Sequence, residues 1–332
     1  MTTGTRAALT RADVEAVVGD AVLAPSIHNT QPWLFHAHGD TVEVHADARR
    51  TLRVVDPTGR ALLLSVGAAV LTLRLSVLVR LGREPVVRLL PDGDPAHVAT
   101  VRVAGRRAPS PVDLALHAAV PRRRTRRDPF EARPLPREVV ERLVTAAHME
   151  GAGLRLLAPD AVRWVLELTG EAERQWRADP AFQTELARWT SEDPEGTEGV
   201  PVAASGPRDH LAHLHPRDFA VGRPWPGRPV ARFEPHPQLA VLTTTHDRAA
   251  DQLRAGQALQ RVLLTATDAG VCVGLLHQPL EVPDLRRLLR DPSSGPESPQ
   301  MVLRLGYAPG PTPPAVHRRP LGEVLSIDSD GA

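Results

Sequence analysis

Apolar residues recur at helical spacing in four stretches of the chain, and each stretch predicts a helix with a buried face. The four predicted helices cover Arg11–Ala24, Ala61–Leu81, Arg137–Met149 and Ala255–Ala269. The second of these is apolar nearly all round, so we expect it to be buried between layers of the fold. Pro25 ends the first helix because proline cannot continue the hydrogen bonding, and Gly82 ends the second.

Shorter runs of alternating or continuous apolar residues predict strands between these helices. Phe35–Ala46 contains the alternating run Thr41-Val42-Glu43-Val44 and predicts a hairpin that turns at His38-Gly39-Asp40. The other predicted strands are Pro85–Leu90, Val98–Val103, Gly153–Ala158, Leu239–Thr244 and Gln300–Tyr307, with a short helix at Val112–Val120. This mixture of helices and strands predicts the α+β class.

The order of elements in the second half repeats that of the first loosely. The stretches Gly67–Gly82 and Gly256–Gly270 both begin with Gly-x-Ala and end at a glycine. Duplication of a half-domain would explain this repeat. Chance similarity between two helices rich in Ala and Leu explains it equally well.

The regular pattern is lost between about residues 170 and 233. A charged, helix-like piece, Glu171–Trp189, precedes a long stretch rich in Pro, Gly and His. Such long connections are usually functional lids or disordered. This one carries six aromatic residues, too many for a linker: Trp176, Phe182, Trp189, Phe219, Trp225 and Phe233. We therefore expect a packed, lid-like cover.

Composition excludes several classes of protein. The 332 residues are 42% hydrophobic with a formal net charge of +1, which indicates a globular chain without the strongly basic face of a nucleic-acid binder. A single Cys272 excludes an intrachain disulfide. The start of the chain lacks a signal-peptide pattern, and polar residues interrupt the apolar run Leu62–Leu81, so we expect a cytoplasmic protein with no membrane partner.

Two segments carry the most informative chemistry. The first is the turn Ala24-Pro25-Ser26-Ile27-His28-Asn29-Thr30-Gln31-Pro32-Trp33, which holds the only Asn of the chain. The second is the run Arg122-Arg123-Arg124-Thr125-Arg126-Arg127-Asp128-Pro129-Phe130. Taken alone, the turn could be an Asx-type turn with Trp33 in the core, and the run could be a solvated basic stretch in an arginine-rich protein.

Together these segments resemble the two halves of the flavin mononucleotide (FMN) site in the nitroreductase fold, and most of the chain resembles the actinobacterial Acg-like nitroreductase group. Further segments support this resemblance: Asp56-Pro57-Thr58-Gly59-Arg60, Glu185-Leu186-Ala187-Arg188-Trp189, Ala255-Gly256-Gln257-Ala258-Leu259-Gln260 and Pro299–Tyr307. In the family the two segments come from different subunits. Their presence on one chain implies two fused half-domains, at 1–115 and 116–332, with a lid-like insertion at about 170–233. It also implies a monomeric pseudo-dimer with a single complete site.

The resemblance assigns cofactor-binding roles to particular residues. Arg123 and Arg127 would take the phosphate, because Arg presents fixed, forked donors, and Arg124 is assigned to the same cofactor site. Thr125 would face the ribityl chain. Ser26, Asn29 and Gln31 would offer polar groups to the cofactor, while Pro25 fixes the backbone of the turn.

Two later segments complete the implied site. Gly270–Gln278 resembles the family segment whose backbone faces flavin N5, which places Leu276, His277 and Gln278 there; a buried strand after a helix is the alternative. Arg318 and Arg319 follow Gly306-Tyr307-Ala308-Pro309-Gly310 and resemble the basic tail of the phosphate cradle; a solvated tail is the alternative. Cys272 is expected to pack as a small apolar residue.

Other chemistry is absent or weak in the sequence. His210, His213 and His215 have no carboxylate or thiol at metal-ligand spacing, so we expect ordinary surface histidines. There is no Gly-rich dinucleotide fingerprint or phosphate loop, so a nicotinamide would bind only transiently.

The resemblance implies an FMN-dependent oxidoreductase that passes hydride from NAD(P)H to a small acceptor, such as a nitroaromatic or a quinone. It implies no catalytic acid. Two alternatives use the same site: a catalytically weak protein that sequesters or stores FMN beneath the cover, and a flavin-dependent oxidase or desaturase of a specific metabolite.

Overall fold

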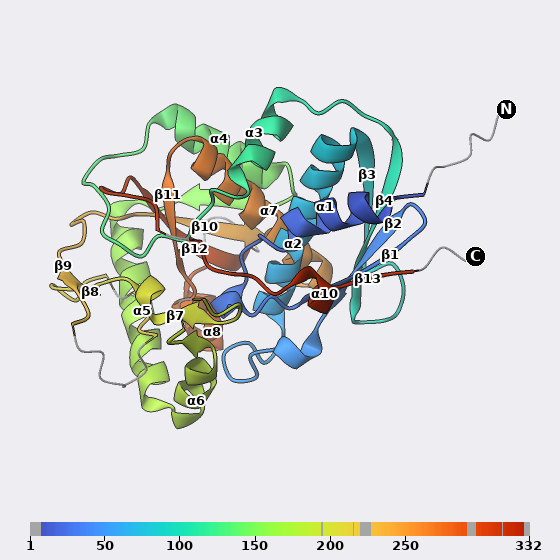
Figure 1. Cartoon of the computed structure of the whole chain (residues 1–332). Helices are drawn as coiled ribbons and strands as arrows, with labels where there is room; N and C mark the ends of the chain where they lie inside the picture. The colour runs from blue at the N-terminus through green and yellow to red at the C-terminus, as the bar shows by residue number, and fades with distance from the viewer. Residues whose placement is uncertain are drawn as a thin grey trace.

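The computed structural model describes residues 8–193, 195–214, 216–219, 227–290, 297–313 and 315–328. The first part of the chain forms a sheet against long helices (Figure 1). Its helices are α1 (Arg11–Ala21), α2 (Arg60–Leu81) and α3 (Pro111–Ala119), with 3-10 turns η1 (Ile27–Asn29) and η2 (Ala48–Arg50). Its strands are β1 (Trp33–His38), β2 (Thr41–Ala46), β3 (Arg83–Leu89) and β4 (His97–Arg106).

The remainder of the chain forms a second sheet, more helices and a series of short elements. The helices are α4 (Arg137–His148), α5 (Pro159–Ala178), α6 (Pro180–Arg188), α7 (Ala249–Asp268), α8 (Gln278–Glu281), α9 (Pro283–Leu288) and α10 (Leu321–Val324), with the 3-10 turn η3 (Val202–Ser205). The longer strands are β5 (Gly153–Leu156), β10 (Gln238–Thr244), β11 (Cys272–Leu276), β12 (Ser298–Gly306) and β13 (Leu325–Ile327). The two-residue strands are β6 (Thr190–Ser191), β7 (Val200–Pro201), β8 (Arg208–Asp209) and β9 (Val230–Ala231).

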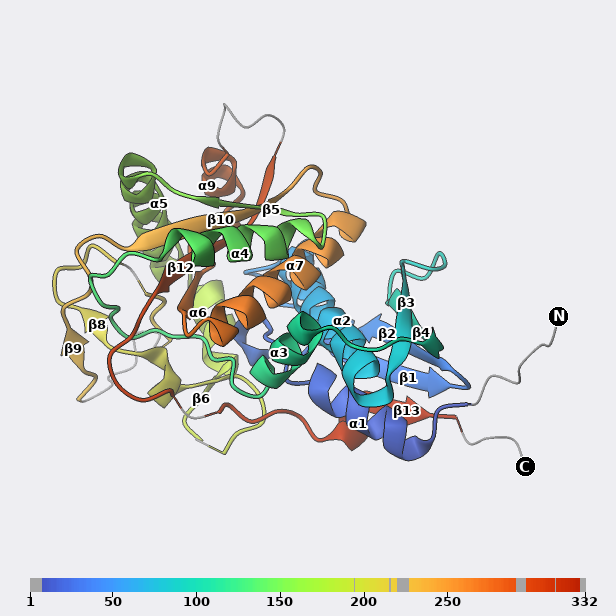
Figure 2. The same ribbon diagram turned by 90° about the horizontal axis from the view of Figure 1, so that it is seen from above.

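Two sheets lie on opposite sides of the pair α2 and α7 (Figure 2). One sheet has the order β13-β1-β2-β4-β3 and the other the order β11-β12-β10-β5. In the hairpin β1–β2, the alternate residues Trp33, Phe35 and Val44 are fully buried, as the alternation predicts. β13 pairs in parallel with β1, with Leu325 opposite Phe35, so the end of the described chain completes the first sheet. The division at residues 115 and 116 stays a prediction.

The two long helices cross at a pair of glycines. A Cβ atom on Gly67 would lie 2.3 Å from the carbonyl oxygen of Leu253, and one on Gly256 would lie 2.1 Å from that of Leu64. Only glycine permits backbones to approach so closely. The two long helices therefore pack against each other inside one chain, and the arrangement fits two fused half-domains.

α2 is long and apolar enough to cross a membrane, yet 83% of its most apolar window is buried inside the protein. Its start is fixed by Asp56, whose carboxylate accepts hydrogen bonds from the N–H groups of Ala61 and Leu62 at 3.0 and 2.8 Å. The packing of α2 against α1, α3 and α7 therefore accounts for its apolar surface.

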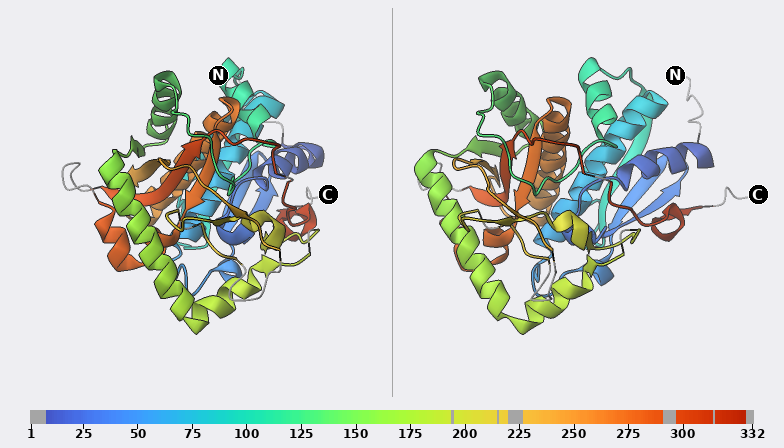
Figure 3. Two further views of the ribbon diagram at one scale, coloured as in Figure 1. Left: turned by 90° about the vertical axis from the view of Figure 1, so that its left-hand side faces the viewer. Right: turned by 60° about the vertical axis from the view of Figure 1, so that its left-hand side comes forward.

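The segment expected to be a cover is more helical than its sequence indicates. Gly170 lies buried inside α5, which runs from Pro159, and α6 turns away from the end of α5 (Figure 3). The aromatic rings of Trp176 and Phe182 stack at 4.9 Å. Phe182, Trp189 and Phe219 join one apolar cluster with Ile27, Leu52, Val55, Ala61, Leu186 and Val200. The cover therefore packs on the first part of the chain; Trp225 lies outside the described residues.

Candidate functional site

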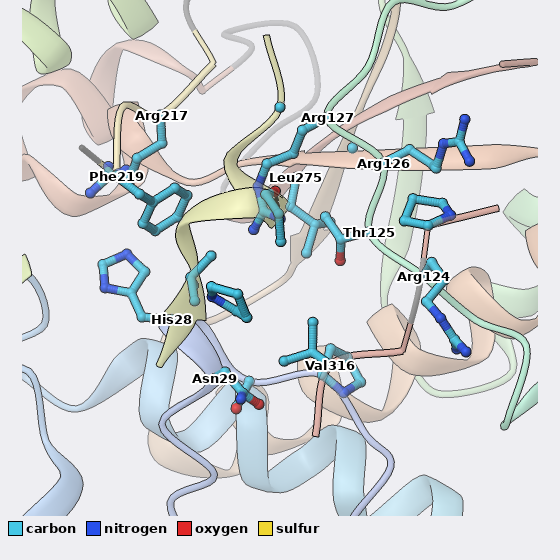
Figure 4. Close-up of a pocket in the computed structure, with 18 of the residues that line it drawn as sticks. His28, Asn29, Arg124, Thr125, Arg126, Arg127, Arg217, Phe219, Leu275 and Val316 are labelled. Atoms are coloured by element: carbon cyan, nitrogen blue, oxygen red, sulfur yellow. Dashed lines mark hydrogen bonds between the residues drawn. The ribbon is translucent and has the colours of Figure 1, made fainter. Parts of the chain in front are cut away.

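A cavity of about 430 Å³ lies between the Pro-Ser turn, the arginine run, β11 and the cover (Figure 4). This volume lies within the range of small-molecule and cofactor sites. Eleven of the thirteen residues predicted for the site line it: Pro25, Ser26, Asn29, Arg123, Arg124, Thr125, Arg127, Leu276, His277, Gln278 and Arg318. Segments far apart in the chain therefore meet at one place.

The Pro-Ser turn has an unusual backbone. His28, Asn29 and Gln31 have φ angles of 47°, 55° and 48°, in the left-handed region that residues other than glycine rarely adopt. The Oγ of Ser26 accepts a hydrogen bond of 2.9 Å from the N–H of Gln31. The N–H of Ile27 donates to the Oγ of a residue in α2, Ser65, at 3.1 Å. These bonds hold a strained conformation, and such strain gathers at binding sites.

Gln31 and Arg319 do not line the cavity. The Oε1 of Gln31 accepts a hydrogen bond of 2.8 Å from the N–H of Arg319, and its Nε2 donates to the carbonyl of Thr197 at 2.7 Å. The Nδ2 of Asn29 similarly donates to the carbonyl of Gly199 at 3.1 Å. The side-chain amides of Asn29 and Gln31 thus connect the turn to the cover and to the segment around Arg319. This structural role was not predicted from the sequence.

Arg123, Arg124 and Arg318 form a positive pole at one end of the cavity. Arg123 is 6% exposed, and its buried Nε and Nη1 have no hydrogen-bond partner among the described residues. Burial, together with the charges of Arg318 and Arg124, lowers the pKa of Arg123 to about 9. Burial also lowers the pKa of Arg318 to about 10. The positive charges of these three arginines favour the binding of an anion at this end of the cavity.

Arg127 belongs to a different group at the other end of the cavity. Its guanidinium lies 5.1 Å over the ring of Phe219, and its Nη1 donates to the carbonyl of Ala204 at 2.9 Å. Burial lowers its pKa to about 10, with a further contribution from Arg217. Figure 4 shows Arg217, Phe219 and His28 on one side of the cavity and Arg124 on the other. Arg127 thus contacts Phe219 and Ala204, whereas the charges that act on Arg123 are those of Arg318 and Arg124; their shared phosphate role stays a prediction.

Two neutral imidazoles lie near Arg127. His28 is buried, its ring lies edge-on to that of Phe219 at 5.5 Å, and neither ring nitrogen has a hydrogen-bond partner among the described residues. Burial holds the pKa of His28 well below its usual value, and the charge of Arg217 adds to this. Burial likewise lowers the pKa of His277 to about 3. Both rings can therefore donate or accept one hydrogen bond without carrying charge.

Carboxylates balance the charge of Arg217. Its Nη2 donates to a carboxylate oxygen of Glu281 at 2.5 Å, and its Nε lies 3.6 Å from Glu173. Burial raises the pKa of Glu281 to about 7, although Arg217 acts in the opposite direction. This ion pair contrasts with the pole at Arg123, where arginines face one another.

The strand β11 forms one wall of the cavity, and residues 274–278 line it, whereas the place of Leu276, His277 and Gln278 beside flavin N5 stays a prediction. Thr125 forms an isolated parallel bridge with Val273, and the N–H of Arg126 donates to the carbonyl of Val273 at 2.8 Å. A Cβ atom on Gly274 would lie 2.9 Å from the carbonyl oxygen of Arg126. The arginine run is thus attached directly to the strand.

Several lining residues were not assigned to the site from the sequence: His28, Arg126, Arg217, Phe219, Arg304 and Val316. Arg304 could have been recognised from the sequence as a candidate site residue, since it is the one charged residue in the apolar stretch Met301–Leu305. Arg217 and Phe219 had no such signal beyond their place in the cover. His213 is paired with Asp209 at 2.8 Å, and His215 lies outside the described residues.

Comparison with known proteins identifies the family. The model of the nitroreductase family matches residues 120–307. "Putative NAD(P)H nitroreductase Rv3131" of Mycobacterium tuberculosis H37Rv is 36% identical over 94% of this chain and 90% of its own length. "Putative NAD(P)H nitroreductase acg" of the same strain is 30% identical over 95% of each chain. The chain therefore belongs to the nitroreductase family, as the sequence analysis inferred.

Among solved structures, the FMN-dependent nitroreductase NfnB from Mycobacterium smegmatis, in complex with NADPH, aligns with 15% identity and a TM-score of 0.38. The alignment covers 65% of this chain and 99% of NfnB.

Proposed function

We propose that the cavity binds FMN and that the protein is an FMN-dependent oxidoreductase, which passes hydride from NAD(P)H to a small acceptor such as a nitroaromatic or a quinone. Membership of the nitroreductase family and the names of the curated relatives support this proposal. Bound FMN would supply the hydride chemistry, while the protein supplies binding, orientation and access.

The pole formed by Arg123, Arg124 and Arg318 would hold the phosphate. The N–H groups of Arg123 that find no acceptor within the described residues carry this assignment, because a buried donor without an acceptor is costly and a phosphate oxygen would remove that cost. Three guanidinium groups also suit a dianionic phosphate in charge and in geometry. The residues present therefore fit the phosphate end of the cofactor.

The other end of the cavity would hold the flat part of the cofactor and the reacting molecule. Phe219 and Leu276 offer apolar surface, and the neutral rings of His28 and His277 offer hydrogen bonds without charge. Arg127 would add a positive charge near this end. Nothing in this arrangement requires a catalytic acid.

Purified protein tests the proposal directly. We expect it to bind FMN and to oxidise NADPH or NADH when menadione or a nitroaromatic compound is present. Failure to bind FMN, even after reconstitution, would contradict the proposal; binding without oxidation of either nucleotide would leave only the cofactor assignment.

The packing of the cover favours a second candidate, in which the protein sequesters FMN and reacts slowly. Hydrogen bonds join the cover to the turn at Asn29 and Gln31 and to the arginine run at Arg127. A cover held in this way would restrict access to the cavity. FMN binding with very slow oxidation of NADPH and NADH, increased by loosening the cover, would support this candidate.

A further inference from the structure

A group of imidazole and carboxylate side chains lies on the sheet of the first part of the chain, outside the arginine-lined cavity. Glu43 and His45 are on β2, and His97 begins β4. One ligand atom from each of the three lies within 4.8 Å of the other two. β2 and β4 are neighbours in the sheet that lies across α2 and α7 from β10 and β12 (Figure 2).

A β-bulge brings the two histidines together. The pairing of β2 with β4 is regular as far as Val44 opposite Ala99, and the register then shifts so that His45 lies opposite His97. Val98 and Ala99 are both fully buried. The rings of His45 and His97 stack with centroids 4.6 Å apart and an angle of 20° between their planes. Bulges commonly re-aim side chains in this way.

The ring of His97 is oriented by a carboxylate. The Oδ2 of Asp92 lies 2.8 Å from Nδ1 of His97, so the proton belongs on Nδ1 and the lone pair on Nε2. Histidine ligands of metals usually show this second contact, which fixes the ring and raises its basicity. Nε2 accepts a hydrogen bond of 3.0 Å from the hydroxyl of Thr100, and a bond to a metal ion could replace this hydrogen bond.

Glu43 lies between two imidazoles. Its Oε2 is 3.1 Å from Nε2 of His45, and its Oε1 is 3.3 Å from Nε2 of His38. The first separation is close to the distance between neighbouring ligands of a tetrahedral ion with bonds of about 2.0–2.1 Å. His38 on β1 is thus placed beside the three-residue group.

We propose that Glu43, His45 and His97 bind one divalent transition-metal ion, with Zn²⁺ as the best match. Imidazole nitrogens with one carboxylate suit Zn²⁺, whereas Mg²⁺ prefers oxygen ligands. Three protein ligands leave a fourth position for water or for His38. The ion would link β2 to β4 at the bulge. This inference is independent of the proposed function.

The test uses full-length protein without a polyhistidine tag, treated with EDTA and titrated with ZnCl₂ by isothermal calorimetry. We expect one Zn²⁺ per chain and no binding of Mg²⁺. The double variant Glu43→Gln/His45→Gln should lose this binding. The matched control His36→Ala should keep it, because among the described residues the polar partners of the His36 side chain are Ser326 and Asp328, and its ring meets only that of His38, at 5.7 Å, and none of the three proposed ligands.

A second variant keeps all three ligands. Asp92 is 52% exposed, so Asp92→Asn should fold normally while weakening Zn²⁺ binding about 10- to 100-fold through the orientation of His97. Absence of Zn²⁺ binding in the wild type would overturn the proposal, as would unchanged binding in the double variant. If the double variant does not fold, unchanged affinity in Asp92→Asn overturns it instead.

Discussion

At the scale of single residues, Arg123 gives the sharpest test of the cavity. Its side chain is buried beside two other arginines, and its Nε and Nη1 have no hydrogen-bond partner in the described parts of the chain. We expect Arg123→Ala to weaken FMN binding about ten- to a hundredfold, because a hydrogen bond to a charged group contributes about 1.5–3 kcal/mol. The measurement is a titration of the apoprotein with FMN, followed by flavin fluorescence.

Arg122→Ala is the matched control for Arg123→Ala. Arg122 is the preceding arginine of the run and is exposed, and among the described residues its side chain donates only to the carbonyl of Ala118. It should leave FMN affinity unchanged. Equal affinities in both variants would contradict the assignment of the FMN phosphate to Arg123.

His277 gives the stability of the protein a dependence on pH. Its pKa is about 3 in the fold and near 6.5 when unfolded, so between these values the unfolded chain binds more protons and stability falls with falling pH. The loss is up to about 1.4 kcal/mol per pH unit. Glu281 has the opposite effect on stability. Its pKa is raised to about 7, so between about pH 4.5 and 7 the folded chain binds more protons and the free energy of unfolding rises with falling pH.

Urea unfolding of wild type and His277→Gln at pH 7.5 and pH 5 isolates this contribution. We expect the free energy of unfolding to fall less in the variant than in the wild type on going to pH 5. An identical fall in both proteins would show that His277 is not held neutral in the fold.

The sequence predicted the residues that line the cavity better than it predicted their tasks. Ser26, Asn29 and Arg123 are found because each lies in a short contiguous pattern. Arg127, by contrast, contacts Phe219 and Ala204, which lie far away in the chain. No local pattern contains that information.

At the scale of elements, the crossing of α2 and α7 depends on Gly67 and Gly256. We expect Gly67→Ala to lower the free energy of unfolding by about 3 kcal/mol, because the new methyl group would meet the backbone of Leu253 and the helices would have to separate. Gly322→Ala in α10 is the control, since a Cβ there meets nothing within 4 Å. Urea unfolding measures the stability of both variants. Equal free energies of unfolding for Gly67→Ala and Gly322→Ala would contradict a close crossing of α2 and α7.

The cover can be loosened at one glycine. Gly206 has a φ of +72°, and a Cβ atom on it would lie 2.9 Å from the carbonyl oxygen of Arg127. We expect Gly206→Ala to push the cover from the arginine run and to raise NADPH oxidation with menadione while FMN stays bound. The measurement is the loss of absorbance of NADPH.

Gly227→Ala is the control for Gly206→Ala, because it introduces backbone strain without pushing the cover away from the arginine run. Gly227 also has a positive φ, of +80°, but a Cβ atom there meets nothing within 4 Å. It should leave the rate of NADPH oxidation unchanged. If Gly206→Ala also leaves the rate unchanged, and small acceptors already react rapidly with the wild type, the cover does not limit access.

Most helices and strands could be predicted because their apolar residues are periodic, and the long apolar helix was placed to within one residue at its start. The exceptions have physical causes. The start of α5 was missed because Pro159 at its first turn resembles the end of an element, although proline is favoured there. β13 has only three residues and is stabilised by a distant strand, so its own sequence carries little signal.

At the scale of the whole molecule, the cavity is built from one chain. We expect one FMN per chain, measured by flavin absorbance after denaturation, and a monomer by light scattering. The apolar faces of α2 and α7 already cover each other, so no partner is needed for them. Two flavins per chain, or a dimer that loses flavin on dilution, would contradict a single intrachain site.

The pairing of β13 with β1 also constrains the order in which the molecule is made. The side chains of His36 and Ser326 are within hydrogen-bond distance although they lie 290 residues apart. During synthesis, the edge of the first sheet at β1 can therefore be paired only after nearly the whole described chain has been made. The tail that leads to β13 carries Arg318, so the positive pole is also incomplete until then. Assembly of the cavity is consequently a late event, and a nascent chain holding only the first half has an open strand edge.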